Sequence, residues 1–160
     1  MHKFNLAAAF LFFGAFTMPV SASNSMSINY AAGKESGVEK MHGMNVMFKH
    51  DMGNFALVAS GSYIQNTSGS GDSYLKNKYA SIMPGLAINI TQDINLYGLA
   101  GISCGSKMKP DQSHEIYGAA FGAGLFYNLT DNIQLNTGYE LGLVDNKGID
   151  TFIIGIGYLF

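Results

Sequence analysis

The chain has 160 residues, of which 48% are hydrophobic and only 12% are charged, and its formal net charge is −2. Soluble proteins carry about 25% charged residues, so this composition is unusual for a soluble domain. The small net charge does not indicate a nucleic-acid partner, all nine basic residues are lysine, and the single cysteine, Cys104, excludes an intrachain disulfide.

The first 22 residues have the layout of a secretory signal peptide. Lys3 is followed by the apolar run 6–16 and by the small-residue stretch 20–22. The apolar run is too short for a transmembrane helix, which needs about 20 residues to cross a bilayer about 30 Å thick. The sequence therefore predicts a signal peptide over 1–22 that is cleaved after Ala22, and an exported mature domain over 23–160.

Beyond this segment, apolar residues alternate with small or polar ones with a period of two, which indicates β-strands. In the clearest case, Leu135 and Tyr139 share one face, and Asn136 and Glu140 share the other. The same alternation predicts eight strands, near 25–33, 41–51, 54–65, 76–90, 94–105, 115–129, 133–143 and 150–160.

Short and long connectors alternate between these strands. The short ones are the turns 51–54, 91–93 and 130–132, and the long polar ones are 34–40, 66–75, 106–114 and 144–149. Short periplasmic turns and long extracellular loops are typical of outer-membrane barrels. We therefore predict an all-β fold over 23–160, an eight-stranded antiparallel up-and-down transmembrane β-barrel, with a soluble β-sandwich as the alternative.

A closed barrel accounts for the two kinds of face. In hydrocarbon every backbone polar group must be paired within the protein, so strands cross a membrane only as a closed barrel. The apolar rows then face lipid, and the small or polar rows fill an interior that leaves no pore at about eight strands. The aromatic residues predicted for the interfacial girdles are Tyr97, Tyr127, Tyr158 and Phe160.

Two charged residues, Lys49 and Glu140, fall on inward-facing positions of this alternation. An isolated charge inside a barrel is costly unless it is paired, so we predict that the two form part of an interior polar network. The alternative is that each lies near a strand end and is hydrated there.

Residue types that often carry chemistry are present, but their spacing does not indicate a reactive centre. His42 and His50 lie at opposite ends of one strand on the lipid-facing row, which does not favour a metal site. Ser113, His114 and Glu115 contain the types of a catalytic triad, but adjacent residues rarely point at one another. We predict no enzyme activity, no cofactor and no metal, and we place Cys104 against lipid.

Four lysines near the predicted long loops, Lys76, Lys78, Lys107 and Lys109, are candidates for a basic patch that contacts lipopolysaccharide phosphates or sulfated host glycans. Because loops 66–75 and 106–114 are long and share one side, we expect them to bind a host or matrix partner. A structural barrel with passive loops is the alternative.

Four stretches resemble one family, the Ail/Lom/OmpX group of enterobacterial outer-membrane proteins. They are Lys40-Met-His-Gly-Met-Asn-Val-Met-Phe-Lys-His, Leu96-Tyr-Gly-Leu-Ala-Gly-Ile, Tyr117-Gly-Ala-Ala-Phe-Gly-Ala-Gly-Leu and the C-terminal Phe152-Ile-Ile-Gly-Ile-Gly-Tyr-Leu-Phe. The last of these is the most specific, because its Tyr158 and Phe160 resemble the signal read by the outer-membrane assembly machinery. The family usually has a basic residue at the position of Leu159 and more basic residues in strand two, where this chain has Met47. These departures concern the interior charge network and any basic adhesive surface.

The resemblance implies a bacterial outer-membrane protein that acts through its extracellular loops in adhesion to host cells or matrix, in invasion or in complement resistance. It also implies contact with outer-membrane lipid, with lipopolysaccharide and with the assembly machinery, and it allows host matrix or complement-regulatory partners. We expect a monomer. A lipid A-modifying barrel enzyme is the more distant alternative.

Overall fold

The computed structural model describes residues 24–35, 40–68, 75–109, 112–144 and 147–160. The predicted signal peptide and its cleavage after Ala22 lie outside the described residues, as do the centres of the four predicted long loops. Among the described residues, no helix has the length and apolarity needed to cross a membrane.

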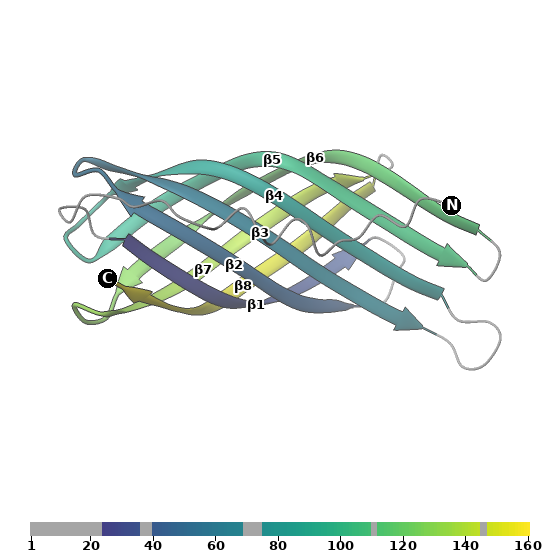
Figure 1. The fold of residues 1–160 in the computed structure, drawn as a ribbon, viewed down its shortest axis with the longest axis horizontal. Coiled ribbons are helices and arrows are strands. Elements are labelled where there is room, and N and C mark those ends of the chain that lie inside the picture. The colour runs from purple at the N-terminus through teal and green to yellow at the C-terminus, as the bar shows by residue number, and fades with distance from the viewer. Residues whose placement is uncertain (1–23, 36–39, 69–74, 110–111, 145–146) are drawn as a thin grey trace.

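Eight antiparallel strands form a closed barrel in which each strand pairs with its neighbours in the sequence (Figure 1). The strands are β1 (Asn24–Glu35), β2 (Met41–Asp51), β3 (Phe55–Ser68), β4 (Leu75–Asn89), β5 (Ile94–Lys109), β6 (Gln112–Asn128), β7 (Ile133–Val144) and β8 (Lys147–Leu159). The predicted fold class and strand count are therefore confirmed.

The barrel is closed by a ladder between β1 and β8. It runs from Ser25↔Leu159 to Glu35↔Ile149. Just beyond it, the backbone N–H of Asn24 donates to the carbonyl of Phe160 at 3.0 Å, and the N–H of Phe160 donates to the carbonyl of Asn24 at 2.8 Å. The first and last described residues are thus hydrogen-bonded to each other.

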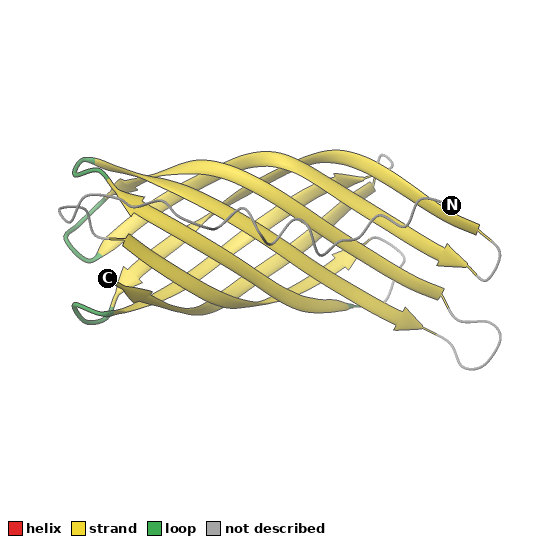
Figure 2. Cartoon of the chain, in the orientation of Figure 1, coloured by secondary structure: helices red, strands yellow, loops and turns green. Residues whose placement is uncertain are grey.

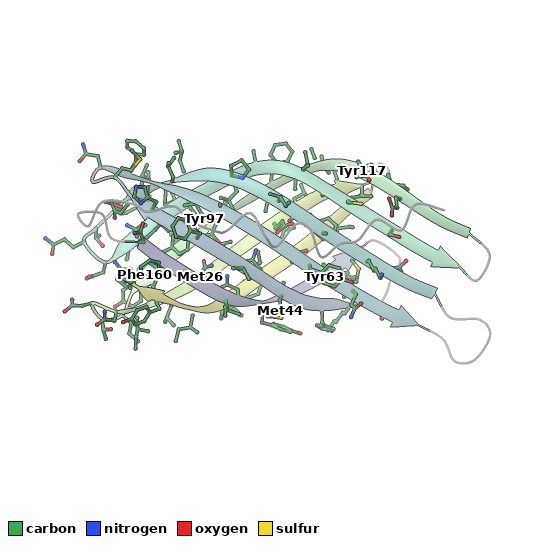
Figure 3. All side chains as sticks on the ribbon, in the orientation of Figure 1. Met26, Met44, Tyr63, Tyr97, Tyr117 and Phe160 are labelled. Atoms are coloured by element: carbon green, nitrogen blue, oxygen red, sulfur yellow. The ribbon has the colours of Figure 1, made fainter. Side chains whose placement is uncertain are left out.

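Polar side chains face the inside of the barrel and apolar side chains face outward, which is the reverse of the arrangement in soluble proteins. In β7, Gln134 is fully buried inside the barrel while its neighbour Leu135 is 42% exposed on the outside. The same inversion holds on every strand, and Figure 3 shows apolar side chains such as Met44 on the outer surface. A surface of this kind is stable only where hydrocarbon is the solvent.

The described turns gather at one end of the barrel, which we call the short-turn end (Figure 2). Two of them have the same hydrogen bonds. Thr91 Oγ1 accepts from the N–H groups of Asp93 and Ile94, and Thr130 Oγ1 accepts from those of Asn132 and Ile133. The C-terminus lies at this end too, and we call the opposite end the long-loop end (Figure 1).

The prediction that 106–114 is a loop was wrong. The β5–β6 ladder continues without a break to Lys109↔Gln112, and the β7–β8 ladder continues to Val144↔Lys147. These segments hold mostly lysine, serine, aspartate and amide residues, so they lack the apolar alternation that marks a membrane strand. They nevertheless form β-strands, because an antiparallel ladder can continue in water once the membrane-spanning part of the two strands has fixed their register.

Candidate functional site

The interior holds a buried carboxylate with neutral partners. Glu140 on β7 is fully buried, and its two carboxylate oxygens accept hydrogen bonds from Ser62 Oγ on β3 and Tyr79 Oη on β4, each at 2.6 Å. Bonds of this length are typical of hydroxyl donors to an ionised carboxylate. Glu140 therefore connects strands on opposite sides of the barrel.

A chain of amides and hydroxyls extends from Ser62 toward the short-turn end. Asn45 Nδ2 donates to Ser62 Oγ at 2.9 Å, and Asn29 Nδ2 donates to Asn45 Oδ1 at 2.8 Å. Asn136 Nδ2 donates to Asn29 Oδ1 at 3.2 Å, and Tyr97 Oη donates to Asn136 Oδ1, also at 3.2 Å. The network fills this part of the lumen with hydrogen-bonded side chains instead of an aqueous channel.

Lys49 is also buried, closer to the short-turn end. Its Nζ donates to Asn95 Oδ1 at 2.9 Å and lies 5.5 Å from the centre of the Phe126 ring, and Asn95 in turn donates to Asn89. Both Lys49 and Glu140 thus lie inside, but these hydrogen bonds join them to different partners. Their direct pairing stays a prediction.

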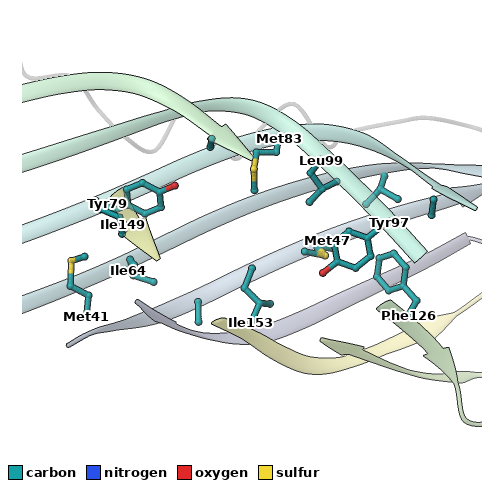
Figure 4. Close-up of a cluster of buried hydrophobic side chains, with 14 of the residues drawn as sticks. Met41, Met47, Ile64, Tyr79, Met83, Tyr97, Leu99, Phe126, Ile149 and Ile153 are labelled. Carbon is teal, nitrogen blue, oxygen red and sulfur yellow. The ribbon is translucent and has the colours of Figure 1, made fainter. Parts of the chain in front are cut away.

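The prediction that Tyr97 belongs to an interfacial girdle was wrong. Its side chain is only 2% exposed and packs inside the barrel against Phe126, with ring centroids 4.6 Å apart (Figure 4). The β5 register decides this, because Leu96 and Gly98 point outward and leave position 97 inside. Gly124 and Gly138 lie against the ring, and these glycines in facing strands were the available signal.

Apolar residues close the lumen toward the long-loop end. Met41, Ile64, Tyr79 and Ile149 belong to the buried cluster in Figure 4, and the Tyr79 ring lies against Gly142. A β-carbon at Gly142 would lie 2.3 Å from the Tyr79 hydroxyl, so only glycine leaves room for the ring. This layer separates Glu140 from the outer mouth.

Four outward-facing tyrosines mark the long-loop side of the apolar surface, and we call them the tyrosine ring. They are Tyr30, Tyr63, Tyr117 and Tyr139, and Figure 3 labels two of them. Each hydroxyl is hydrogen-bonded to a polar side chain, and the partners are His42, Gln65, Glu115 and Asp150 respectively. An aromatic ring with a bonded polar tip is the side chain expected at a membrane interface.

The tyrosine ring was not among the predicted girdle residues, although Tyr63 and Tyr117 lie two residues from predicted strand ends, as Tyr127 and Tyr158 do. At the opposite end, the predicted girdle residues Tyr127, Tyr158 and Phe160 are exposed on the outer surface. The reading of Tyr158 and Phe160 as an assembly signal stays a prediction.

The four candidate lysines lie at the long-loop ends of two adjacent strands. Lys76 and Lys78 belong to β4, and Lys107 and Lys109 belong to β5, with Lys76 paired to Met108 and Lys78 to Ser106. Only Lys78 has a described side chain, and it is half-buried. A shared basic patch stays a prediction.

The residue types that often carry chemistry remain dispersed. Ser113, His114 and Glu115 occupy successive positions of β6, where they pair with Met108, Lys107 and Ser106 of β5. His42 and His50 lie on the outer row, and His50 Nδ1 is hydrogen-bonded to Asn24 at 2.6 Å. Within the described residues, no three His, Cys, Asp or Glu side chains gather as metal ligands.

Comparison with known proteins agrees with this geometry. A family model described as the outer membrane protein beta-barrel domain matches residues 8–160. Outer membrane protein X of Escherichia coli K12 is 33% identical over 163 residues, which cover 96% of this chain and 94% of that protein. The virulence membrane protein PagC of Salmonella typhimurium is 29% identical over 161 residues, covering 86% and 87%.

The solved structures include the same architecture. The crystal structure of Ail, the attachment invasion locus protein of Yersinia pestis, in complex with the heparin analogue sucrose octasulfate, superposes with a TM-score of 0.79. Its sequence is 26% identical, and the match covers 87% of this chain and 99% of that one.

Proposed function

This chain belongs to the outer-membrane β-barrel protein family, and we propose that it binds host or matrix partners through the hairpins at its long-loop end. It is an integral protein of the bacterial outer membrane, and in such barrels the long-loop end faces the exterior. Its relatives include proteins named for virulence and for attachment and invasion.

The observation that carries the proposal is the unequal length of the ladders at this end. The β3–β4 ladder reaches Ser68↔Leu75 and the β5–β6 ladder reaches Lys109↔Gln112, whereas the β6–β7 ladder stops at Ala119↔Leu143. Four strands therefore rise beyond the rest of the barrel. Within the described residues, the 112–118 edge of β6 has no pairing partner on β7.

A projecting sheet suits recognition of a large ligand. A free strand edge presents unpaired N–H and C=O groups to an incoming chain. The lysines of β4 and β5 lie on the same projection, and clustered lysines attract polyanions at a distance that depends on salt. The Ail structure with a heparin analogue supports a sulfated glycan as the first ligand to try.

We also propose how the chain is exported and assembled, and that it works as a monomer. Residues 1–22 act as a signal peptide, Tyr158 and Phe160 guide assembly of the 23–160 domain, and the folded chain works as a monomer without catalysis. Host matrix and complement-regulatory proteins are the candidate protein partners. The attachment and virulence names of the relatives support a binding role in preference to an enzymatic one.

The test uses bacteria that express the full chain. We expect replacement of 106–114 by a two-residue turn to reduce adherence to host cells and survival in serum, while the barrel still shifts mobility on heating. In a second variant, Lys107→Gln with Lys109→Gln should weaken retention on immobilised heparin. The charge-matched control is Lys34→Gln with Lys40→Gln beside the β1–β2 connection. Unchanged adherence, serum survival and heparin retention would favour a structural barrel with passive loops.

A further inference from the structure

We propose that the layer of the lumen around Glu140 is a binding site for one monovalent cation of the sodium type. The site, which we call the lumen cage, consists of the carboxylate of Glu140 and the hydroxyl groups of Ser62, Tyr79, Ser81 and Ser103. The cation is a structural ligand inside the barrel, so the proposal is independent of the binding of a host partner at the long-loop end.

The strand register brings the cage residues together. Ser62 pairs with Ser81 and Ser81 pairs with Ser103, so the three serines form one row across β3, β4 and β5. All three are buried, and residues directly opposite each other in antiparallel strands have β-carbons about 5 Å apart. Tyr79 on β4 donates to Glu140 on β7, and its hydroxyl also lies close to the side chains of Ser81 and Ser103. Oxygen atoms from four strands therefore meet in one layer.

The protons of three hydroxyl groups in the cage already have acceptors. Ser62 Oγ and Tyr79 Oη each donate to the carboxylate of Glu140 at 2.6 Å. Ser103 Oγ donates to the carbonyl of Ala119 at 3.1 Å. A hydroxyl oxygen that has donated its proton still has lone pairs with which it can accept. The cage thus presents oxygen lone pairs, the ligands that hard cations take in proteins.

Ser81 adds a ligand that has no other role in the structure. Its side chain is only 4% exposed, and among the described residues its Oγ atom has no hydrogen-bond partner. Buried polar side chains nearly always have a partner, so this hydroxyl needs an explanation. A cation held between Ser81 and Glu140 gives the hydroxyl a partner and the carboxylate a counter-charge.

The charge of Glu140 is the second reason for a cation. Among the buried side chains that the structure describes, the only other charged one is that of Lys49. Lys49 pairs with Val58, four residues along β3 from Ser62, which is about 13 Å of strand, and its ammonium donates to Asn95. A buried charge is costly unless it is compensated. One carboxylate among neutral oxygens balances a single positive charge.

The prediction of no metal was made from the spacing of the histidines, and the present proposal departs from it. Within the part of the chain that the structure describes, no three His, Cys, Asp or Glu side chains gather as ligands. A cage of one carboxylate and several hydroxyls has no recognisable spacing in a sequence. Its members come from four strands, and their meeting depends on how far each strand is shifted along its neighbour.

The test measures unfolding of the chain purified from outer membranes and reconstituted in phosphatidylcholine, a lipid without net charge. Unfolding by urea is followed while sodium chloride replaces choline chloride at constant ionic strength, because choline is too large for the cage. Only the folded barrel holds the cation. The ratio of folded to unfolded chain should therefore rise about tenfold for each tenfold increase in sodium above its dissociation constant. Equal stability in the two salts would overturn the proposal and favour direct pairing of Glu140 with Lys49.

Two variants assign the cation to the cage. Ser81→Ala should remove most of the sodium dependence, because it deletes one ligand and keeps both hydrogen bonds to Glu140. Ser25→Ala is the matched control, since Ser25 is also a buried serine of the lumen but donates to Gln134 at 2.9 Å. It should retain the sodium dependence of the parent.

Glu140→Gln should abolish the sodium dependence, because it removes the charge that the cation balances. Sodium dependence that survives in Ser81→Ala or in Glu140→Gln would place the cation outside the cage and overturn the proposal. Ser81→Ala keeps the test decisive if Glu140→Gln does not fold.

Discussion

Gly138 lies so close to Tyr97 that a β-carbon on the glycine would fall 2.1 Å from the tyrosine hydroxyl. The ring crosses the lumen from β5 and occupies the space left by a missing side chain on β7. The hydroxyl then reaches Asn136 Oδ1 at 3.2 Å and the carbonyl of Thr137 at 3.3 Å. A pair of facing residues, one large and one without a side chain, therefore sets how closely the two walls approach.

Gly138→Ala should destabilise the barrel by about 1–3 kcal/mol, because the ring must leave its position or the strands must move. The measurement is the temperature at which the folded band disappears on a gel. Gly98→Ala is the matched control, since Gly98 faces outward and a β-carbon added there would meet nothing within 4 Å. Equal loss of stability in both variants would contradict the proposed role of the ring.

Glu140→Gln should lower the unfolding temperature, because the amide offers one acceptor where the carboxylate offers two. We expect a loss of about 1–3 kcal/mol. The cross-strand neighbour Thr151→Val is the control, because among the described residues the buried Thr151 hydroxyl has no hydrogen-bond partner. An unfolding temperature that is unaffected by Glu140→Gln would remove Glu140 from the stabilising network.

Tyr79→Phe should cost about as much as Glu140→Gln, because it removes one of the two donors to the same carboxylate. The double variant should lose clearly less than the sum of the two single losses, since both substitutions break one shared bond. Strict additivity, measured by the same heating series, would mean that the 2.6 Å contact contributes little.

Lys49→Met should destabilise the short-turn half of the lumen, because it leaves Asn95 Oδ1 without its donor while keeping an apolar stem near Phe126. Combined with Glu140→Gln, the losses should add to within about 0.5 kcal/mol, since the two charges have different partners. A coupling above about 1 kcal/mol would instead support direct pairing of Lys49 and Glu140.

Thr130→Ala should cost about 1 kcal/mol, because the Thr130 hydroxyl accepts from two backbone N–H groups of the β6–β7 turn. Thr130→Ser retains the hydroxyl and should be nearly neutral. Thr91→Ala in the equivalent β4–β5 turn should lower the free energy of unfolding by a similar amount. Chemical denaturation measures this free energy for each single variant, and the double variant provides an internal check.

The eight strands were predictable because lipid on one side and a crowded lumen on the other impose a period of two along each strand. For β7 the predicted 133–143 differs from Ile133–Val144 by one residue. For β5 the prediction stopped at 105 and the strand continues to Lys109. Outside the membrane the alternation no longer separates apolar from polar residues, so the pattern ends before the ladder does.

The interior partners were not predictable to the same degree. The alternation correctly placed Lys49 and Glu140 in the lumen, because each strand has only two faces. It did not identify Ser62, Tyr79 or Asn95 as their partners, because contacts across the lumen depend on how far each strand is shifted along its neighbour. The aromatic character of Tyr97 favours a girdle position, but Leu96 and Gly98 on either side of it face outward and leave Tyr97 in the lumen.

The hydrogen bonds between Asn24 and Phe160 have a consequence for the order of events during assembly. Seven of the eight strand pairs join neighbours in the sequence and can form as local hairpins, whereas the β1–β8 pair joins the two ends of the domain. Closure therefore waits for β8, and until β8 pairs with β1 both strands keep an open edge. A chain that lacks β8 cannot close this barrel, so before closure both edges are exposed to pairing with another chain.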